Sequence, residues 1–279
     1  MTTAISILCD NNISRSGFIG EHGFSALLER KEGNYLFDTG PGLSLPLNLK
    51  ALQKDLTGLH KVFLSHGHYD HTGGLKWVVE QGETMEVIAH PAVFSEHMVV
   101  DPGKPGAAPR YVGCPFSREA LEDLGANFVF LDRTREAAPG LWFLAGFERD
   151  PQFLPEDARL VSRQNGKLVR DHLLDDASLL LETESGPVLI LGCAHAGILN
   201  ILDHLKRDLH IDRLRGILGG THLMFYGEGA LAQVIRKIED FNVDLIAVSH
   251  CTGMNAAIRL AKHFGDRFRP ASAGTVIGF

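Results

Sequence analysis

Short apolar runs, separated by turn residues and amphipathic stretches, dominate the pattern of hydrophobic and polar positions along this chain. Strand-like runs occupy residues 5–8, 24–28, 35–37 and 62–64, and later 178–183, 188–191 and 244–249. Helical patterns separate the later strands, with apolar faces made by Ile198, Leu199, Ile201, Leu202 and Leu205 and by Leu231, Val234, Ile235 and Ile238. We therefore expect an α/β protein with two sheets between outer helices and with its loops gathered along one edge.

Two segments break this regular pattern. Residues 101–115 contain too much Pro and Gly for an ordinary helix or a central strand. Because long irregular loops inside compact domains are usually functional or disordered, we interpret this one as an active-site cover, with a plain surface insertion as the alternative. Residues 149–176 mix Pro and Gly with Arg159, Arg163, Lys167 and Arg170, which could hold an anionic substrate group or form a solvated loop. The expected organisation is one domain over 1–279 with irregular insertions near 95–120 and 149–176.

Composition narrows the class of protein. With 279 residues and 44% apolar composition, the chain can bury a substantial core. The net charge of −7 argues against nucleic acid as the main partner, and no apolar run approaches the ~20 residues that cross a bilayer. The start lacks a basic segment followed by a long hydrophobic one, and the four cysteines form no Cys-x-x-Cys pair. These features favour a cytoplasmic enzyme acting on a small molecule; the oligomeric state stays open.

The densest chemistry lies directly after the apolar run at 62–64. His66, His68, Asp70 and His71 fall within six residues there. Residues two apart project to one side of an extended segment, so His66 and His68 can reach one metal ion. Asp70 and His71 follow where the chain turns into a helix and can reach a second ion. Zinc suits this mixture of imidazole and carboxylate, and manganese and iron also accept it.

This His-x-His-x-Asp-His motif before Gly73-Gly74-Leu75 resembles that of the metallo-β-lactamase superfamily. More of the chain agrees: residues 34–40 resemble the family's strand ending in an Asp-x-Gly turn, and 188–195 and 244–250 each deliver a histidine at a strand end. The phrases at 21–25, 192–198, 219–223 and 249–253 are similar to those of the dihydropterin-synthase-like branch, named for 7,8-dihydropterin-6-yl-methyl-4-(β-D-ribofuranosyl)aminobenzene-5'-phosphate synthase. The resemblance implies an αββα sandwich of two mixed sheets flanked by helices.

The resemblance also implies a binuclear metal site. His66, His68 and His195 would hold the first ion, and Asp70, His71 and His250 the second, most simply as two Zn²⁺. Metal binding lowers the pKa of water toward about 7, so hydroxide becomes available at neutral pH. Asp70 would also act as the orienting or proton-accepting carboxylate. His222 follows another apolar strand and is our candidate for metal binding, substrate contact or proton transfer, whereas His22 is a weaker candidate for lining the pocket.

The chain departs from the commonest superfamily pattern at one point. That pattern has a bridging aspartate in a Gly-Asp step after a later strand, whereas this chain has Gly192-Cys193-Ala194-His195. Either His195 replaces the aspartate, or His172 supplies the earlier histidine and His195 has another role. We favour the first, because no strand precedes His172. Cys193 and Cys251 flank ligand positions, and we interpret both as small buried thiols.

Three classes of function fit such a site. The leading one is hydrolysis of a small ester, lactone, phosphodiester or phosphate-bearing pterin-like substrate by metal-activated water. The alternative is a di-iron redox or oxygen-binding protein on the same scaffold, although flavodiiron-like members usually place Glu where this chain has His68. A noncatalytic metal-binding module is the third, and six candidate ligands with an open position favour chemistry instead.

Overall fold

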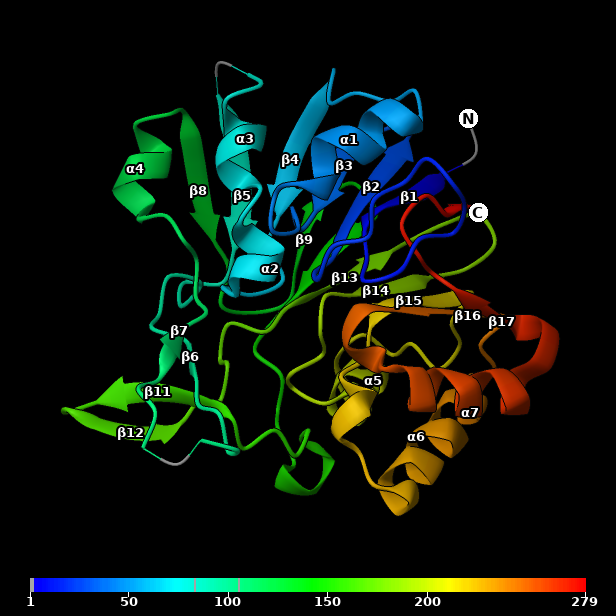
Figure 1. Cartoon of the computed structure of the whole chain (residues 1–279). Coiled ribbons are helices and arrows are strands. Elements are labelled where there is room, and N and C mark those ends of the chain that lie inside the picture. The colour runs from blue at the N-terminus through cyan, green and yellow to red at the C-terminus, as the bar shows by residue number, and fades with distance from the viewer. Residues whose placement is uncertain (1–2, 83, 105) are drawn as a thin grey trace.

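The computed structural model describes residues 3–82, 84–104 and 106–279, and two mixed sheets of seven strands form its centre (Figure 1). The first sheet has the order β18-β1-β2-β3-β4-β5-β8. Its strands are β18 (Val276–Gly278), β1 (Ala4–Cys9), β2 (Ser25–Arg30), β3 (Gly33–Phe37), β4 (Leu59–Phe63), β5 (Met85–Ala89) and β8 (Ala126–Phe130). Pairing is antiparallel from β18 to β3 and parallel from β3 to β8.

The second sheet has the order β17-β16-β15-β14-β13-β10-β9. Its strands are β17 (Phe268–Pro270), β16 (Leu245–Ser249), β15 (Gly216–Gly220), β14 (Val188–Leu191), β13 (Ser178–Leu181), β10 (Leu141–Leu144) and β9 (Arg135–Ala138). The four strands from β14 to β17 are parallel, so the chain leaves each of β14, β15 and β16 at the same edge of the sheet. This edge is where the sequence places its later histidines.

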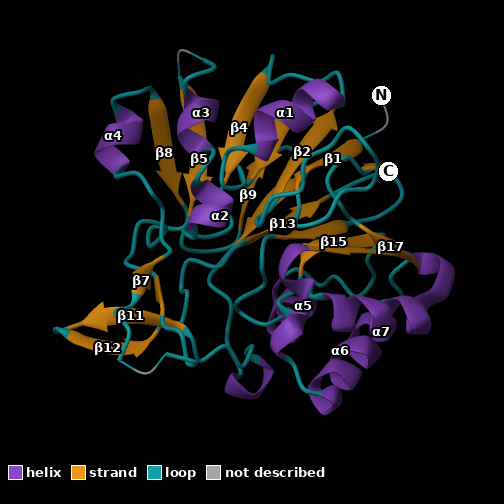
Figure 2. Ribbon diagram, in the orientation of Figure 1, coloured by secondary structure: helices purple, strands orange, loops and turns teal. Residues whose placement is uncertain are grey.

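Helices cover the outer faces of the two sheets (Figure 2). Beside the first sheet lie α1 (Ser44–Ala51), α3 (Leu75–Val79) and α4 (Arg118–Glu122), and α2 (Tyr69–Thr72) continues the histidine loop. Beside the second sheet lie α5 (Ile198–Asp208), α6 (Glu228–Asp240) and α7 (Met254–Phe264). Four short 3-10 turns complete the described elements, at Pro151–Phe153, Leu223–Phe225, His250–Thr252 and Gly265–Arg267. The expected αββα architecture is confirmed.

Alternation along the strands explains this layering. On β2, Ala26 and Leu28 face the second sheet, whereas Leu27 packs with the helices on the outer side. Successive side chains of a strand point to opposite faces, so a strand that is apolar at every position is buried on both sides. Three apolar layers result: one between the sheets and one beneath each set of helices.

The middle layer allows a prediction about stability. Phe63 on β4 and Phe143 on β10 are fully buried and stack across the sheets with ring centroids 6.4 Å apart. Phe143→Ala is expected to lower the free energy of unfolding by about 3–5 kcal/mol, because it leaves a cavity between two rigid sheets. Urea unfolding followed by circular dichroism measures the change. A loss below about 1 kcal/mol would mean that the sheets close over the gap.

The two irregular insertions pair with each other, which the sequence did not reveal. They form a third sheet of order β12-β11-β6-β7, made of β12 (Lys167–Arg170), β11 (Leu160–Gln164), β6 (Met98–Val99) and β7 (Arg110–Tyr111). Residues 101–115 thus stay irregular except for the short edge strand β7, and Pro105 lies outside the described residues. Residues 149–176, expected as a loop, contain the hairpin β11–β12 instead. Short two-residue strands paired across distant segments leave no readable period in a sequence.

Candidate metal centre

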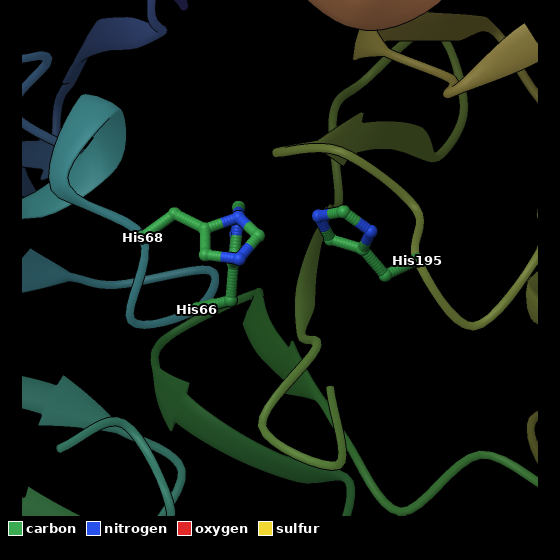
Figure 3. Close-up of side chains that lie close together, drawn as sticks. All are labelled: His66, His68 and His195. Atoms are coloured by element: carbon green, nitrogen blue, oxygen red, sulfur yellow. The ribbon is translucent and has the colours of Figure 1, made fainter. Parts of the chain in front are cut away.

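The candidate site lies where strands of both central sheets end. His66 and His68 follow β4 of the first sheet, and three parallel strands of the second sheet lead to His195, His222 and His250. Figure 3 shows the side chains of His66 and His68, which follow a strand of the first sheet, pointing toward that of His195, which follows a strand of the second. Gly192, at the end of β14, permits this approach, because a Cβ there would lie 2.1 Å from Ser65 Oγ. The fold therefore brings together residues that are more than a hundred positions apart.

The first group consists of His66, His68 and His195. Their ligand atoms all lie within 4.8 Å of one another, and all three side chains are buried. His66 Nε2 is 3.0 Å from His68 Nδ1, and the His66 and His195 ring centroids are 4.7 Å apart. Burial lowers the pKa of His68 to about 3, and burial together with neighbouring imidazoles lowers the pKa of His66 and of His195. All three rings are therefore neutral and can offer a lone pair.

Two nitrogen atoms of this group test whether it fits a metal ion. Nε2 of His68 and Nε2 of His195 are buried and have no hydrogen-bond partner among the described residues. An unpaired buried polar atom costs about 1–3 kcal/mol. A divalent cation would use both lone pairs, and three imidazoles make up the protein ligands of a typical catalytic zinc site. The residues present therefore fit a metal ion.

The second group gathers around His250. Its Nε2 lies 3.3 Å from His71 Nε2 and 3.5 Å from Asp70 Oδ2. His22, with an exposed side chain, adds a ring nitrogen 3.4 Å from Asp70 Oδ2, and its ring centroid is 5.0 Å from that of His250. The ligand atoms of His22, Asp70 and His250 also lie within 4.8 Å of one another. The sequence suggested only a pocket-lining role for His22, whereas the structure adds it to this group.

Gly23 explains how His22 reaches the site. A Cβ at this position would lie 2.2 Å from the backbone oxygen of Asp70. The adjacent Phe24 N–H donates to the same oxygen over 3.2 Å. The segment before β2 therefore packs directly against the loop that carries His66, His68 and Asp70. The glycine between His22 and Phe24 was the available sequence signal. Its importance comes from its close contact with the Asp70 backbone, which the sequence does not show.

Asp38 orients one ring in each group: that of His71 directly and that of His66 through Ser65. Its Oδ2 is 2.7 Å from His71 Nδ1 and 2.6 Å from Ser65 Oγ, and Ser65 Oγ is 2.8 Å from His66 Nδ1. The arrangement assigns an N–H to Nδ1 of both rings, because Ser65 donates its own proton to the carboxylate. Nε2 then carries the lone pair on His66 and His71. Carboxylate–histidine pairs of this kind fix the ring orientation and raise the basicity of metal ligands.

An aspartate pair ties the two ligand loops together. Asp175 accepts a hydrogen bond from Gly67 N over 2.6 Å, between His66 and His68. Asp176 accepts from His195 N over 3.0 Å and from Ala196 N over 2.9 Å. Both side chains are fully buried. One dipeptide thus positions both sides of the first group, a role that the sequence did not reveal because Asp-Asp before a strand has no specific pattern.

His97 supports the same loop from the side. Its ring centroid is 5.2 Å from that of His68, and its Nδ1 lies 2.6 Å from Asp171 Oδ2. Burial alone would lower the pKa of His97, but the carboxylates of Asp171 and Asp175 outweigh it and raise this pKa to about 10. His97 is therefore a protonated partner of two aspartates and has no free lone pair for a metal ion.

His222 lies at the wall of a cavity over the metal groups. Both of its ring nitrogens are buried without a hydrogen-bond partner in the described chain, and Nε2 is 3.8 Å from Asp157 Oδ2. Its backbone is left-handed, with φ 52°, as it is at Ala194 and His250. Such backbone costs about 1–3 kcal/mol per residue and gathers at functional sites. His172, the alternative to His195, is exposed and lies outside the first group.

Comparison with known proteins gives the family. The metallo-β-lactamase superfamily matches residues 19–250. In Methanocaldococcus jannaschii, 7,8-dihydropterin-6-methyl-4-(β-D-ribofuranosyl)-aminobenzene-5'-phosphate synthase is 27% identical over 95% of this chain and 92% of its own length. From the same organism, the uncharacterized protein MJ0448 is 31% identical over 98% of this chain and 99% of its own length.

Solved structures agree with this result. The structure of Tm1679, a metal-dependent hydrolase of the β-lactamase superfamily, has a TM-score of 0.83 and 26% identity, covering 99% of this chain and 98% of its own. In the described part of the chain no helix is long and apolar enough to span a bilayer. The resemblance expected from the sequence motifs is confirmed, and the chain belongs to the metallo-β-lactamase superfamily.

Proposed function

We propose that this protein is a metal-dependent hydrolase with two divalent ions, zinc being the best match to its ligands. The observation that carries the proposal is the meeting of two donor groups, one with two unpartnered buried nitrogens, beneath a cavity that substrate can enter. Its likeness to the hydrolase Tm1679 supports the same reaction class. Divalent ions at such sites supply Lewis acidity and hydroxide at neutral pH. The substrate is a small ester, lactone, phosphodiester or phosphate-bearing pterin-like compound.

Some side chains of the site would bind the metal ions, and others would transfer protons. His66, His68 and His195 would hold one ion, and Asp70, His71 and His250 the other. Asp70 also faces the cavity, where a carboxylate can accept a proton from the attacking water. His222 lines the same cavity, and its unpartnered ring nitrogens suit it to donate a proton to the leaving group or to contact the substrate. Asp157 beside it would keep that ring oriented.

The cavity mouth favours an anionic substrate. Arg110 of β7 and Arg159 before β11 both line the cavity, so the sheet formed by the two insertions carries the cations. Arg159 is held by Asp157 through Nε and Nη2, each 2.8 Å from a carboxylate oxygen, and its guanidinium lies 4.6 Å from the Phe225 ring centroid. Arg110 is exposed and forms no ion pair with a described residue. Arg110 is therefore the cation available to a substrate.

Arg110→Ala is expected to raise KM for an anionic substrate about tenfold with little change in kcat, because a charge-assisted hydrogen bond contributes about 1.5–3 kcal/mol and exposure reduces it. Steady-state kinetics on an anionic ester and its neutral analogue measure the effect. Arg163→Ala is the matched control, since Arg163 lies on β11 near Glu96 outside the cavity lining. An equal loss on the neutral ester would contradict the assignment.

A metal-removal experiment tests the proposed function itself. Purified protein is treated with a chelator, assayed against phosphodiesters, lactones, thioesters and pterin phosphates, and then reloaded with Zn²⁺, Mn²⁺ or Fe²⁺. We expect chelation to abolish turnover and one metal to restore it. A purified protein with no bound metal and full turnover after chelation would end the proposal. Colour or redox activity without hydrolysis would favour the di-iron alternative.

A further inference from the structure

We propose that Cys193 is a metal ligand whose sulfur is shared between the two ion positions, an inference that rests on the proposed metal dependence. The sequence suggested a plain buried thiol at this position. Cys193 directly follows Gly192 at the end of β14, and its side chain is 2% exposed.

The surroundings of the sulfur carry the argument. Cys193 Sγ forms one group with His66 and His71, a second with His195 and His222, and a third with His250 and Cys251, each with all ligand atoms within 4.8 Å of one another. His66 and His195 belong to the first metal group, and His71 and His250 to the second. Among the described residues that belong to neither group, Cys193 is therefore the one that these sets join to members of both.

The contact with His71 specifies how the sulfur is used. Sγ lies 3.2 Å from His71 Nε2, whose other ring nitrogen donates to Asp38. His250 shows the same arrangement, because its Nδ1 lies 2.9 Å from Asn11 Oδ1 and its Nε2 lies 3.3 Å from His71 Nε2. Two imidazole lone pairs and a sulfur thus point at one another. A cation between them would turn this unfavourable contact into coordination, and a coordinating thiol is deprotonated.

The backbone is shaped to present both side chains of this turn. Ala194, between Cys193 and His195, has a left-handed φ of 59°, which is uncommon for a residue other than glycine. Asp176 holds the next two backbone N–H groups. A thiolate is a soft ligand, so its presence favours zinc, cobalt or iron over manganese or magnesium. The proposal therefore also narrows the choice of metal to zinc, cobalt or iron.

Cobalt(II) gives a readout that does not depend on activity. Metal-free protein is titrated with Co²⁺, following metal content and thiolate-to-cobalt charge-transfer absorption. We expect two ions per chain and a charge-transfer band that grows over both equivalents. Cys193→Ala should lose the band and weaken the second ion more than about tenfold, since even an outer partner of a ligand contributes 10–100-fold. Cys193→Asp should keep two ions without the band.

Two further variants serve as controls. Cys114→Ala removes a buried thiol from one of the insertions and should leave both ions and the band unchanged. Cys251→Ala removes the neighbouring thiol and should also retain the band. A wild-type protein that binds two ions without a band, or a band that Cys251→Ala alone abolishes, overturns the proposal. A band complete after one equivalent overturns the shared position. A wild-type protein that binds no metal at all refutes the proposed function instead.

Discussion

His66→Ala is expected to remove the metal ion of the first group and to lower kcat/KM more than about 100-fold, because loss of even an outer-shell partner of a metal ligand costs 10–100-fold. His66 is fully buried at the centre of the site, with His68, His71 and His195 rings all within 4.7 Å of its own centroid. Metal content by atomic spectroscopy and kcat/KM on the best substrate measure the two effects.

His263→Ala is the matched control for this change. His263 lies on the exposed side of α7, where it pairs with Glu239 over 2.9 Å far from the metal groups. We expect it to keep metal and activity. Because an imidazole is replaced by a methyl group in both variants, a general effect of losing a histidine is excluded. Retained turnover with unchanged metal content in His66→Ala would falsify the assignment of the first group.

Asp38→Ala is expected to cost about 3–5 kcal/mol of stability and to weaken metal binding 10–100-fold. The carboxylate is fully buried and accepts from Ser65 N over 2.7 Å and from Ser65 Oγ over 2.6 Å, beside His71 Nδ1 at 2.7 Å. Truncation leaves these donors unpaired in the interior. It also frees the rings of His66 and His71 to turn. Urea unfolding without metal, together with metal titration, separates the two losses.

Asp38→Asn distinguishes packing from charge. The amide keeps the shape and can still accept from Ser65 N, so the loss of stability should be smaller. Its NH₂ group is a donor only and can accept neither from Ser65 Oγ nor from His71 Nδ1, so metal affinity should fall nearly as far as in the alanine variant. Asp55→Ala, in an exposed turn where Asp55 accepts from Thr57 N, should change neither property appreciably. Unaltered metal affinity in Asp38→Asn would show that the carboxylate supports the fold alone.

Much of the candidate site could be predicted from the sequence. Strand ends are marked by short-range features, namely an apolar run followed by small or polar residues, and each of the later histidines stands just after such a run. Parallel strands of one sheet end at the same edge, so these histidines were expected to converge. The structure brings His66, His68 and His195 together, and places Asp70, His71 and His250 beside them. Their metal-binding roles remain predictions that the experiments above test.

Three features could not be predicted from the sequence, because each depends on a contact with a residue far away along the chain. Asp175 contacts Gly67, 108 residues away, and nothing in an Asp-Asp step before a strand announces that contact. Cys193 is the small buried thiol that was expected, but one cysteine after a glycine has no ligand spacing of its own, so its contact with His71 could not be foreseen. The two insertions had no readable period, yet they pair to form the sheet that carries Arg110 to the cavity.

The amino-acid sequence by itself determined the αββα class, the strand ends and the kinds of ligand that follow them, because period and turn chemistry act over a few neighbouring residues. Only the tertiary structure decided which ligands meet. It places His195 beside His66 and His68, whereas His172 belongs to no such set, and it brings His22 next to Asp70 and His250 and Cys193 next to His66 and His71. The reason is physical: the His71–His250 contact spans 179 residues, and its geometry is fixed by how two sheets pack on a shared apolar layer.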